Sequence, residues 1–529
     1  ADFAADAGYA LRPKLPVLAG FVPAGADAEK VFRDFRRARG RMMVTHLYGA
    51  VRDWAHAHGM FASAESGGPW NARGQKRDPR TFGECDQFEF LVANDVPQGE
   101  FWPTHEALHP DAGRANRNID FFGRGIVAAA RRAKQPIAAV EAFTHMYGHW
   151  TVDPAFLKPL ADAAFVDGMN RIVWHTYTTS PAKYGVPGLE YFAGTHVNRH
   201  VTWNRDAVAF VRYLGRCQAL LQAGDRIDDG EFLPPTGNYW EWGRFRRDEG
   251  AQFLTTHRRI GAADVFFVTG EGAGEVSLNA VAGGRAVEVW DPVAVTRRTA
   301  EASEANGRTQ VRLDLPRGGS AFVVFADKPA RPLGTDPKNV GTGPVESRVA
   351  GPWRVSFPYH PRVAAEPPKA RTMTRLVDWT SLADMRHFAG TGVYEATFDW
   401  ADAERGRIRL SLGSVPTGLV RVFVNGADCG VAWCAPWEVD VTAAVRQGRN
   451  ELRIEYTNNW HNRLVGDCSL PPERRVTKSA VHYWNVARKG RDGNPWTLRP
   501  TLYSGPSAYD PLQPSGLLGP VRLMAFDGK

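Results

Sequence analysis

The sequence lacks the motifs that mark several large classes of enzyme. It has no G-x-G-x-x-G or P-loop segment to hold a nucleotide phosphate, and no G-x-S-x-G turn to present a serine nucleophile. The five cysteines form no C-x-x-C pair and no H-E-x-x-H segment occurs, so no standard zinc motif is present. Nucleotide chemistry, serine hydrolysis and zinc binding are therefore disfavoured.

Long apolar runs and basic runs are also missing. No 18-residue apolar run occurs, so the sequence predicts no membrane span. The net charge is +8, but the lysines and arginines are scattered, which favours a solvated surface over nucleic-acid binding. Cys429 and Cys434 could pair, although buried free thiols are the expected state for most of the cysteines. The chain starts without Met or a signal peptide, in sequence typical of a domain interior, so we expect upstream sequence to have been removed.

The 529 residues predict several domains, and the first of them alternates strands with helices. Helical patterns cover 28–58, 117–133, 154–168 and 207–224, and strand patterns cover 60–66, 136–141 and 170–177. This alternation predicts parallel strands with helical crossovers. Three or four such units indicate that residues 1–230 form part of a (β/α)8 barrel.

The pattern changes to all-β after residue 230. Short strands separated by glycine-rich turns are predicted at 263–270, 275–283, 286–292, 309–316 and 320–327. They indicate a β-sandwich over residues 231–330, followed by a linker rich in proline and glycine over 331–350. A second all-β stretch over 351–529 predicts another β-sandwich. The fold class is thus multidomain, α/β followed by all-β.

Three acids stand at predicted strand ends or rim loops of the first domain, namely Glu65, Glu100 and Glu141. The ends of parallel barrel strands meet on one face, where the chemistry of such barrels takes place. Cleavage of a glycosidic bond needs one carboxyl group to donate a proton and another to activate water or attack carbon. Each single acid could instead be a helix cap or an ion-pair partner. Together, next to Trp102 and Phe143, they indicate a glycosidase site as strongly as they indicate caps and ion pairs.

Other polar and aromatic side chains gather near these acids or in one C-terminal loop. His145, His149, His175 and Tyr177 could donate hydrogen bonds to sugar hydroxyls, or serve the structure alone. A hard cation such as calcium would suit an oxygen-rich rim. In the segment 456–467, Trp460 could stack on a sugar ring, or the loop could pack two domains together.

Several segments of the chain resemble bacterial α-L-rhamnosidases of glycoside hydrolase family 106. The resemblance rests on GYALRPKLPVLAG (8–20), HLYGAVRDWAHAHG (46–59), QGEFW (98–102), VEAFT (140–144), LKPLADAAFVDGMNRIVWHTY (157–177), VEVWDP (287–292) and NNWHNRLVGD (458–467). It follows the order of the chain over nearly its whole length. The resemblance implies a (β/α)8 barrel followed by β-sandwiches, the last of them galactose-binding-like (a jelly roll).

The resemblance also implies an activity and roles for single residues. It implies inverting hydrolysis of terminal α-L-rhamnose from glycosides or polysaccharides, with a calcium ion that holds the sugar. Glu141 matches the general base and Glu100 an acid of the same site that binds calcium or substrate. Glu65 matches the acid of an A-E-P strand, although Ser66 stands where the family has proline. His145, His175, Tyr177, Trp102 and Trp460 complete the expected substrate-binding set.

One departure from the family concerns the general acid, which we expect upstream of residue 1. The missing N-terminal part of the same enzyme would then be a partner of this chain, and residues 1–529 alone would be inactive. The family implies secretion or a periplasmic location. Two alternatives stay open, a carbohydrate-binding protein with a degenerate barrel and a different glycosidase or lyase on the same scaffold.

Overall fold

A computed structural model gives the fold of this chain. The structure describes residues 2–22, 24–25, 27–65, 89, 91–103, 119–121, 123–145, 150–191, 193–227, 251–327, 345–358, 366–401, 406–482 and 508–526.

The first part of the chain contains a five-stranded sheet with a parallel core. Its order is β1 (Ser63–Glu65), β2 (Val96–Pro103), β4 (Ala139–Ala142), β5 (Arg171–Trp174), and the short β3 (Ile119–Phe121) pairs antiparallel with β2. The pairs β1–β2, β2–β4 and β4–β5 are all parallel. This sheet is the half barrel that the alternation of strands and helices predicts.

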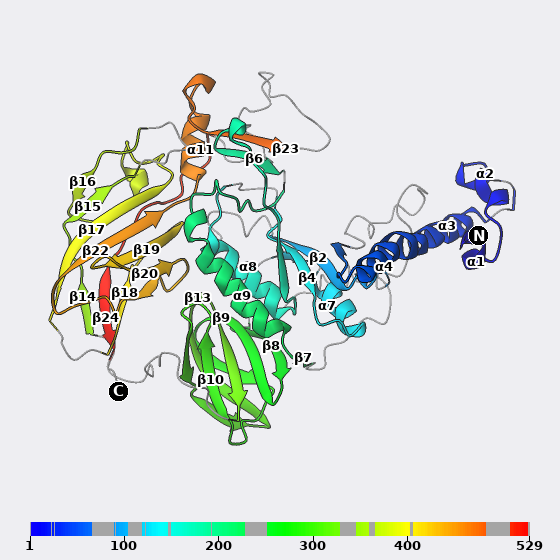
Figure 1. Cartoon of the computed structure of the whole chain (residues 1–529), viewed down its shortest axis with the longest axis horizontal. Helices are drawn as coiled ribbons and strands as arrows, with labels where there is room; N and C mark the ends of the chain where they lie inside the picture. Colours follow the sequence, from blue (N-terminus) through cyan, green and yellow to red (C-terminus); the bar gives the residue numbers. More distant parts are fainter. Residues whose placement is uncertain are drawn as a thin grey trace.

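Helices cover one face of this sheet (Figure 1). They are α7 (Gly123–Arg132), α8 (Pro154–Val166) and α9 (Val208–Gln222). The Asp153 side chain caps α8 by accepting a hydrogen bond from the Phe156 N–H at 3.1 Å, as its position before Pro154 predicts. The predicted helix over 117–133 was wrong at its start, because Ile119–Phe121 alternates apolar and polar residues and pairs as β3.

A long helical rod extends away from the sheets at the N-terminal end (Figure 1). It joins α3 (Ala28–Met42), the π-helical turn η2 (Met43–Gly49) and α4 (Ala50–Ala57), and matches the helix predicted over 28–58. The short helices α1 (Asp2–Ala7), η1 (Arg12–Lys14) and α2 (Leu15–Leu18) lie at its far end.

The middle part of the chain forms a seven-stranded antiparallel sheet with its own apolar core. Its strands are β7 (Asp225–Arg226), β8 (Phe253–Ile260), β9 (Ala263–Leu278), β10 (Ala286–Asp291), β11 (Thr296–Thr299), β12 (Ala302–Ala305) and β13 (Arg308–Ala326). The strand predicted at 286–292 is confirmed by β10, but the separate strands predicted at 263–270 and 275–283, and at 309–316 and 320–327, are wrong, because they are continuous as β9 and β13. Glycine-rich segments continue the pairing of β9 with β13, with a register shift between Leu315 and Gly319 instead of a turn.

The C-terminal part of the chain is built from two further antiparallel sheets. One has four strands, β14 (Val345–Arg348), β24 (Arg522–Phe526), β18 (Arg407–Ser411) and β21 (Glu438–Asp440). The other has six, β16 (Arg371–Met373), β15 (Trp353–Ser356), β17 (Thr391–Trp400), β22 (Gly448–Thr457), β19 (Leu419–Val424) and β20 (Ala427–Ala432). Buried side chains of both sheets, such as Trp353, Tyr394 and Leu410, belong to one core cluster. We call these two sheets and the segments between them the C-terminal sandwich.

Short elements join these parts of the chain. The helix α11 (His461–Cys468) and the turn η8 (Pro472–Arg474) lead to β23 (Lys478–His482), which pairs in parallel with β6 (Pro187–Tyr191) of the first part. The remaining 3-10 turns are η5 (Ala182–Tyr184), η6 (Asn204–Asp206) and η7 (Trp379–Ser381). Residues 331–344 of the expected linker lie outside the described residues, and the domain boundaries stay a prediction.

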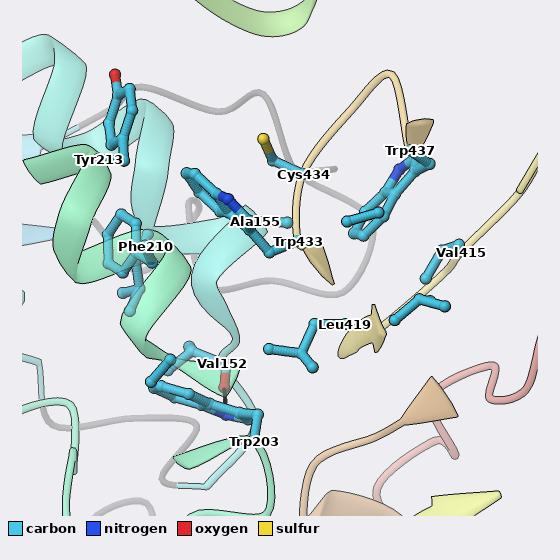
Figure 2. Packing of buried hydrophobic residues seen from close by; sticks show 14 of the residues in the cluster. Val152, Ala155, Trp203, Phe210, Tyr213, Val415, Leu419, Trp433, Cys434 and Trp437 are labelled. Atoms are coloured by element: carbon cyan, nitrogen blue, oxygen red, sulfur yellow. Dashed lines mark hydrogen bonds between the residues drawn. The ribbon is translucent and has the colours of Figure 1, made fainter. Parts of the chain in front are cut away.

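Aromatic packing fixes the C-terminal sandwich against the helices of the half barrel (Figure 2). The ring of Trp433 lies 5.2 Å from that of Phe210 and 5.4 Å from that of Tyr213, both on α9. Trp203 closes the same core and donates a hydrogen bond from its indole N–H to the carbonyl of Val152. Because these side chains are buried, the two parts share one apolar core.

The described cysteines form no disulfide, and only Cys217 and Cys434 among them are buried as expected. Cys217, Cys429, Cys434 and Cys468 are all free thiols, whereas Cys85 lies outside the described residues. Within the described ranges, no helix has both the length and the apolar character to cross a membrane.

Candidate active site

Glu100 and Glu141 lie side by side on neighbouring strands. Glu100 of β2 is in register with Glu141 of β4, in a parallel pair. Neighbouring strands are about 5 Å apart, and paired residues point to the same face of a sheet. Glu141 is in turn in register with Val173 of β5. The structure therefore brings together the two acids that the sequence places in separate motifs.

The two acids point away from the helices. Alternation along β2 and β4 sends Phe101, Val140 and Ala142 to the opposite face, where all three are buried in the helix-packed core. Glu100 is 6% exposed and Glu141, by its side chain, 19% exposed. The acids thus stand on the sheet face that corresponds to a barrel interior, near the carboxyl ends of the strands.

Trp102 is the aromatic neighbour of these acids. It lies two residues after Glu100 and donates a hydrogen bond from its indole N–H to Glu100 Oε2 at 2.9 Å. Phe143 was expected beside the acids as well, but its ring packs behind the sheet, 5.4 Å from the ring of Phe101 and 5.0 Å from that of Trp174. Only Trp102 of the expected aromatic set therefore shields an acid directly.

Glu141 has three polar neighbours. Thr144 donates its hydroxyl hydrogen to Glu141 Oε1 at 2.9 Å, and His175 Nδ1 lies 3.9 Å from the same oxygen. Burial lowers the pKa of His175 although the Glu141 carboxylate acts to raise it, so the imidazole is neutral at pH 7. Burial, and then the Glu141 charge, raise the pKa of Tyr191, whose ring meets that of His175 edge-on at 5.3 Å.

A short segment at 194–195 holds His175 in place. The Thr195 N–H donates to the His175 carbonyl at 2.9 Å, and the Thr176 N–H donates to the Thr195 carbonyl at 3.0 Å. The Gly194 N–H donates to the carbonyl of His145 at 2.6 Å, which ties the ends of β4 and β5 together. Gly194 has a φ of +113°, which only glycine adopts readily.

Replacement of Gly194 by alanine is expected to destabilise the chain by about 1–3 kcal/mol. A Cβ at this position would lie 2.5 Å from His175 Nδ1 and 2.8 Å from the His175 carbonyl oxygen, so the histidine would have to move. Thermal unfolding measures the effect.

Gly215→Ala is the matched control for this substitution. It lies within α9, where no described heavy atom comes within 4 Å of an added Cβ, so alanine should stabilise the helix by about 0.5–1 kcal/mol. A Gly194→Ala chain as stable as the unaltered protein would contradict the packing described for His175.

The other predicted site residues lie at different depths. Glu65 ends β1 in register with Gln98, two residues before Glu100 on the neighbouring strand. Tyr177 follows β5 and is 62% exposed. His145 is 1% exposed and borders a small cavity with room for about one water molecule, too small for a sugar. His149 lies outside the described residues.

Trp460 does not form an open platform for a sugar. Its side chain is 1% exposed, and its indole N–H donates to the carbonyl of His200 at 2.6 Å. The neighbouring Asn459 donates from Nδ2 to the Thr151 carbonyl at 2.6 Å. This geometry favours the alternative that the segment 456–467 packs two parts of the chain together.

Glu100 and Glu141 supply two of the carboxylate groups that a calcium site can use as ligands. Calcium takes about six to eight oxygen ligands, and carboxylates are among the best. Within the described ranges, however, no three acidic, histidine or cysteine side chains gather to hold a metal ion. The described donor set therefore does not by itself meet the demand of calcium.

Sequence reasoning missed the residues that contact Glu141 or its neighbour His175, namely Thr144, Tyr191 and Gly194. Thr144 stands in the VEAFT motif, but only the fold shows that its hydroxyl reaches Glu141. Tyr191 and Gly194 belong to a segment, LEYFAGTH (189–196), that carries no recognised motif. A glycine followed by a threonine after a strand pattern is too common a signal to identify them.

Comparisons with known proteins agree with the resemblance seen in the sequence. Residues 1–234 match the family described as α-L-rhamnosidase, glycoside hydrolase family 106. The solved structure of a rhamnosidase from Novosphingobium sp. PP1Y is similar to the chain with a TM-score of 0.73 and 23% identity, over 99% of this chain and 59% of that one. The resemblance to family 106 is thus confirmed over residues 1–234.

A curated relative carries a different name. A putative β-glucuronidase of Formosa agariphila is 32% identical over 243 residues, which are 45% of this chain and 19% of that protein. A β-glucuronidase structure from Ruminococcus gnavus matches with a TM-score of only 0.23, too low to support any argument. The chain therefore spans about a fifth of the curated relative and about three fifths of the solved rhamnosidase.

Proposed function

We propose that this chain carries part of the active site of an α-L-rhamnosidase that removes terminal α-L-rhamnose from glycosides or polysaccharides. The observation that carries the proposal is the register of Glu100 with Glu141, on the sheet face turned away from the helices. Glycoside hydrolysis by inversion needs a base and an acid, and in this proposal the sheet supplies the base, Glu141, beside a carboxylate for the sugar or calcium, Glu100, while the acid comes from the part of the enzyme upstream of residue 1. The family match over residues 1–234 supports rhamnose as the sugar.

Glu141 is the general base of the proposed inverting mechanism. Its Oε1 accepts the Thr144 hydrogen bond, which orients the carboxylate so that the other oxygen is available to a water molecule. His175 stays neutral and so does not neutralise the carboxylate by a full ion pair. An inverting enzyme needs its acid and base about 6.5–9.5 Å apart, with room for that water.

Glu100 and the residues around it bind the sugar in this proposal. Glu100 accepts hydrogen bonds from sugar hydroxyls or binds calcium, and Trp102 holds its carboxylate in place. Glu65 is a further acid of the site, and His175 and Tyr177 contact the substrate. Tyr177 is exposed past the end of β5, and in this proposal its ring packs against the leaving group of the substrate.

Calcium binding is also a proposal, and no step of the mechanism depends on it. If Glu100 is a ligand, Ca²⁺ should raise the thermal midpoint of the chain, and a chelator should reverse the shift. The Glu100→Gln chain should show no such shift. A midpoint that does not respond to Ca²⁺ in the unaltered chain would contradict this assignment.

Two other functions have support of their own. The name of the Formosa agariphila relative favours a glycosidase for uronic acids. A sheet that only binds sugar would equally keep Glu100 and Glu141. Hydrolysis of an aryl α-L-rhamnoside and of an aryl β-D-glucuronide by the complete enzyme, with calorimetric titration of each free sugar into the same sample, distinguishes the three. Secretion or a periplasmic location belongs to the rhamnosidase proposal.

A further inference from the structure

We propose that the C-terminal sandwich positions the acid site through one segment, residues 187–191 and 193–203, which we call the junction loop. In this inference Trp460 is a positioning residue that acts through the junction loop on His175. The inference rests on the proposed function only in that His175 faces the proposed general base, Glu141.

C-terminal residues hold the first end of the junction loop. There β6 pairs in parallel with β23, from Pro187 with Lys478 to Tyr191 with His482. Asp467, fully buried at the end of α11, fixes the approach to β23. Its Oδ2 accepts hydrogen bonds from the Val476 N–H at 3.1 Å and from the Thr477 N–H at 2.7 Å.

The second end of the junction loop is held by the segment before α11. Trp460 donates its indole hydrogen to the His200 carbonyl at 2.6 Å, and Thr202 donates its hydroxyl to the Asn458 carbonyl. Trp460 is 1% exposed, so its removal would leave a buried carbonyl without that donor. Both ends of the loop are therefore fixed by residues more than 250 positions away in the sequence.

The middle of the junction loop contacts the acid site. Gly194 and Thr195 bind and pack against His175, and the Tyr191 ring meets the His175 ring at 5.3 Å. The Tyr191 N–H also donates to His196 Nε2 at 3.0 Å, which connects the two ends of this stretch. Among the residues that the structure describes, the titratable groups that face His175 are thus Glu141 from β4 and Tyr191 from β6.

The test is the titration of His175 in the Trp460→Phe chain, followed by NMR with labelled histidine. The His175 signal is assigned from its loss in a His175→Gln chain. If the junction loop loosens, water reaches the imidazole, and the pKa of His175 should rise toward its ordinary value by about half a unit or more. No substrate is needed, so the result does not depend on whether the chain is a rhamnosidase.

Trp379→Phe is the matched control within the same sandwich. Trp379 is fully buried, donates its indole hydrogen to the Tyr394 hydroxyl at 2.7 Å, and has its described ring contacts with residues of the C-terminal sandwich. Trp379→Phe should lower the free energy of unfolding about as much as Trp460→Phe does, and it should leave the pKa of His175 unchanged. Thr202→Val, a smaller change at the same end of the loop, should shift His175 in the direction of Trp460→Phe if that chain does not fold.

Two results would overturn the inference. One is a His175 titration that is the same in the unaltered, Trp460→Phe and Thr202→Val chains. The other is an equal shift in Trp379→Phe, because a general loss of stability would then explain the effect.

Discussion

In the complete enzyme, which adds the N-terminal part expected to carry the general acid, Glu141→Gln is expected to lose about 10²–10⁴-fold in turnover of an aryl α-L-rhamnoside while it still binds rhamnose. Glutamine keeps the size of the side chain and can still accept the Thr144 hydrogen bond, but it cannot take a proton from water. Turnover is measured by release of the aryl group, and binding by calorimetric titration with rhamnose.

Thr144→Val is the control for that result. Valine has nearly the shape of threonine but leaves Glu141 Oε1 without its hydroxyl donor, so it disturbs the orientation of the carboxylate and not its chemistry. We expect a loss of about tenfold, in line with one hydrogen bond of about 1–1.5 kcal/mol. If Glu141→Gln kept the turnover of the unaltered complete enzyme, Glu141 would not be the base.

The Lys158→Met chain is expected to lose about 3–5 kcal/mol of stability. Lys158 and Asp162 form an i, i+4 pair on α8 at 2.7 Å, with side chains 3% and 0% exposed. Lys158 also donates to the Gly318 carbonyl at 2.8 Å and to Ser320 Oγ at 2.9 Å, which joins α8 to β13 of the seven-stranded sheet. Methionine would leave the Asp162 charge buried without a cation.

A second lysine–aspartate pair provides a matched control for Lys158→Met. Lys30 and Asp34 have the same i, i+4 spacing on α3, but the Lys30 side chain is 46% exposed. Lys30→Met should cost less than about 1 kcal/mol, because water replaces the lost partner. Chemical denaturation followed by tryptophan fluorescence measures both variants. If Lys158→Met and Lys30→Met lowered the free energy of unfolding equally, the buried Asp162 charge would not be the cause of the loss expected for Lys158→Met.

The sequence predicts the strand that carries Glu141 but not its neighbour in space. An apolar run that ends in an acid indicates a buried strand with a functional end, and β4 has that form. The pairing of Glu141 with Glu100 depends on the register of β4 with β2, which no local pattern specifies. The same holds for His175, which reaches Glu141 only because β5 pairs with β4.

Other features escaped prediction because tertiary contacts override local signals. The glycines at 270, 272 and 274 predict a turn, yet β13 pairs along this stretch and keeps it extended. The sequence allows Trp460 to be either a stacking surface for a sugar or a packing residue, and only its hydrogen bond to the His200 carbonyl in the fold favours packing. Long-range hydrogen bonds of this kind leave no trace in residue spacing.

A crystal structure of the chain with bound L-rhamnose would test the central claim most directly. The account predicts sugar hydroxyls within hydrogen-bond distance of both Glu100 and Glu141, on the sheet face turned away from α7 and α9. Rhamnose bound at another place, with these two carboxylates out of its reach, would contradict it.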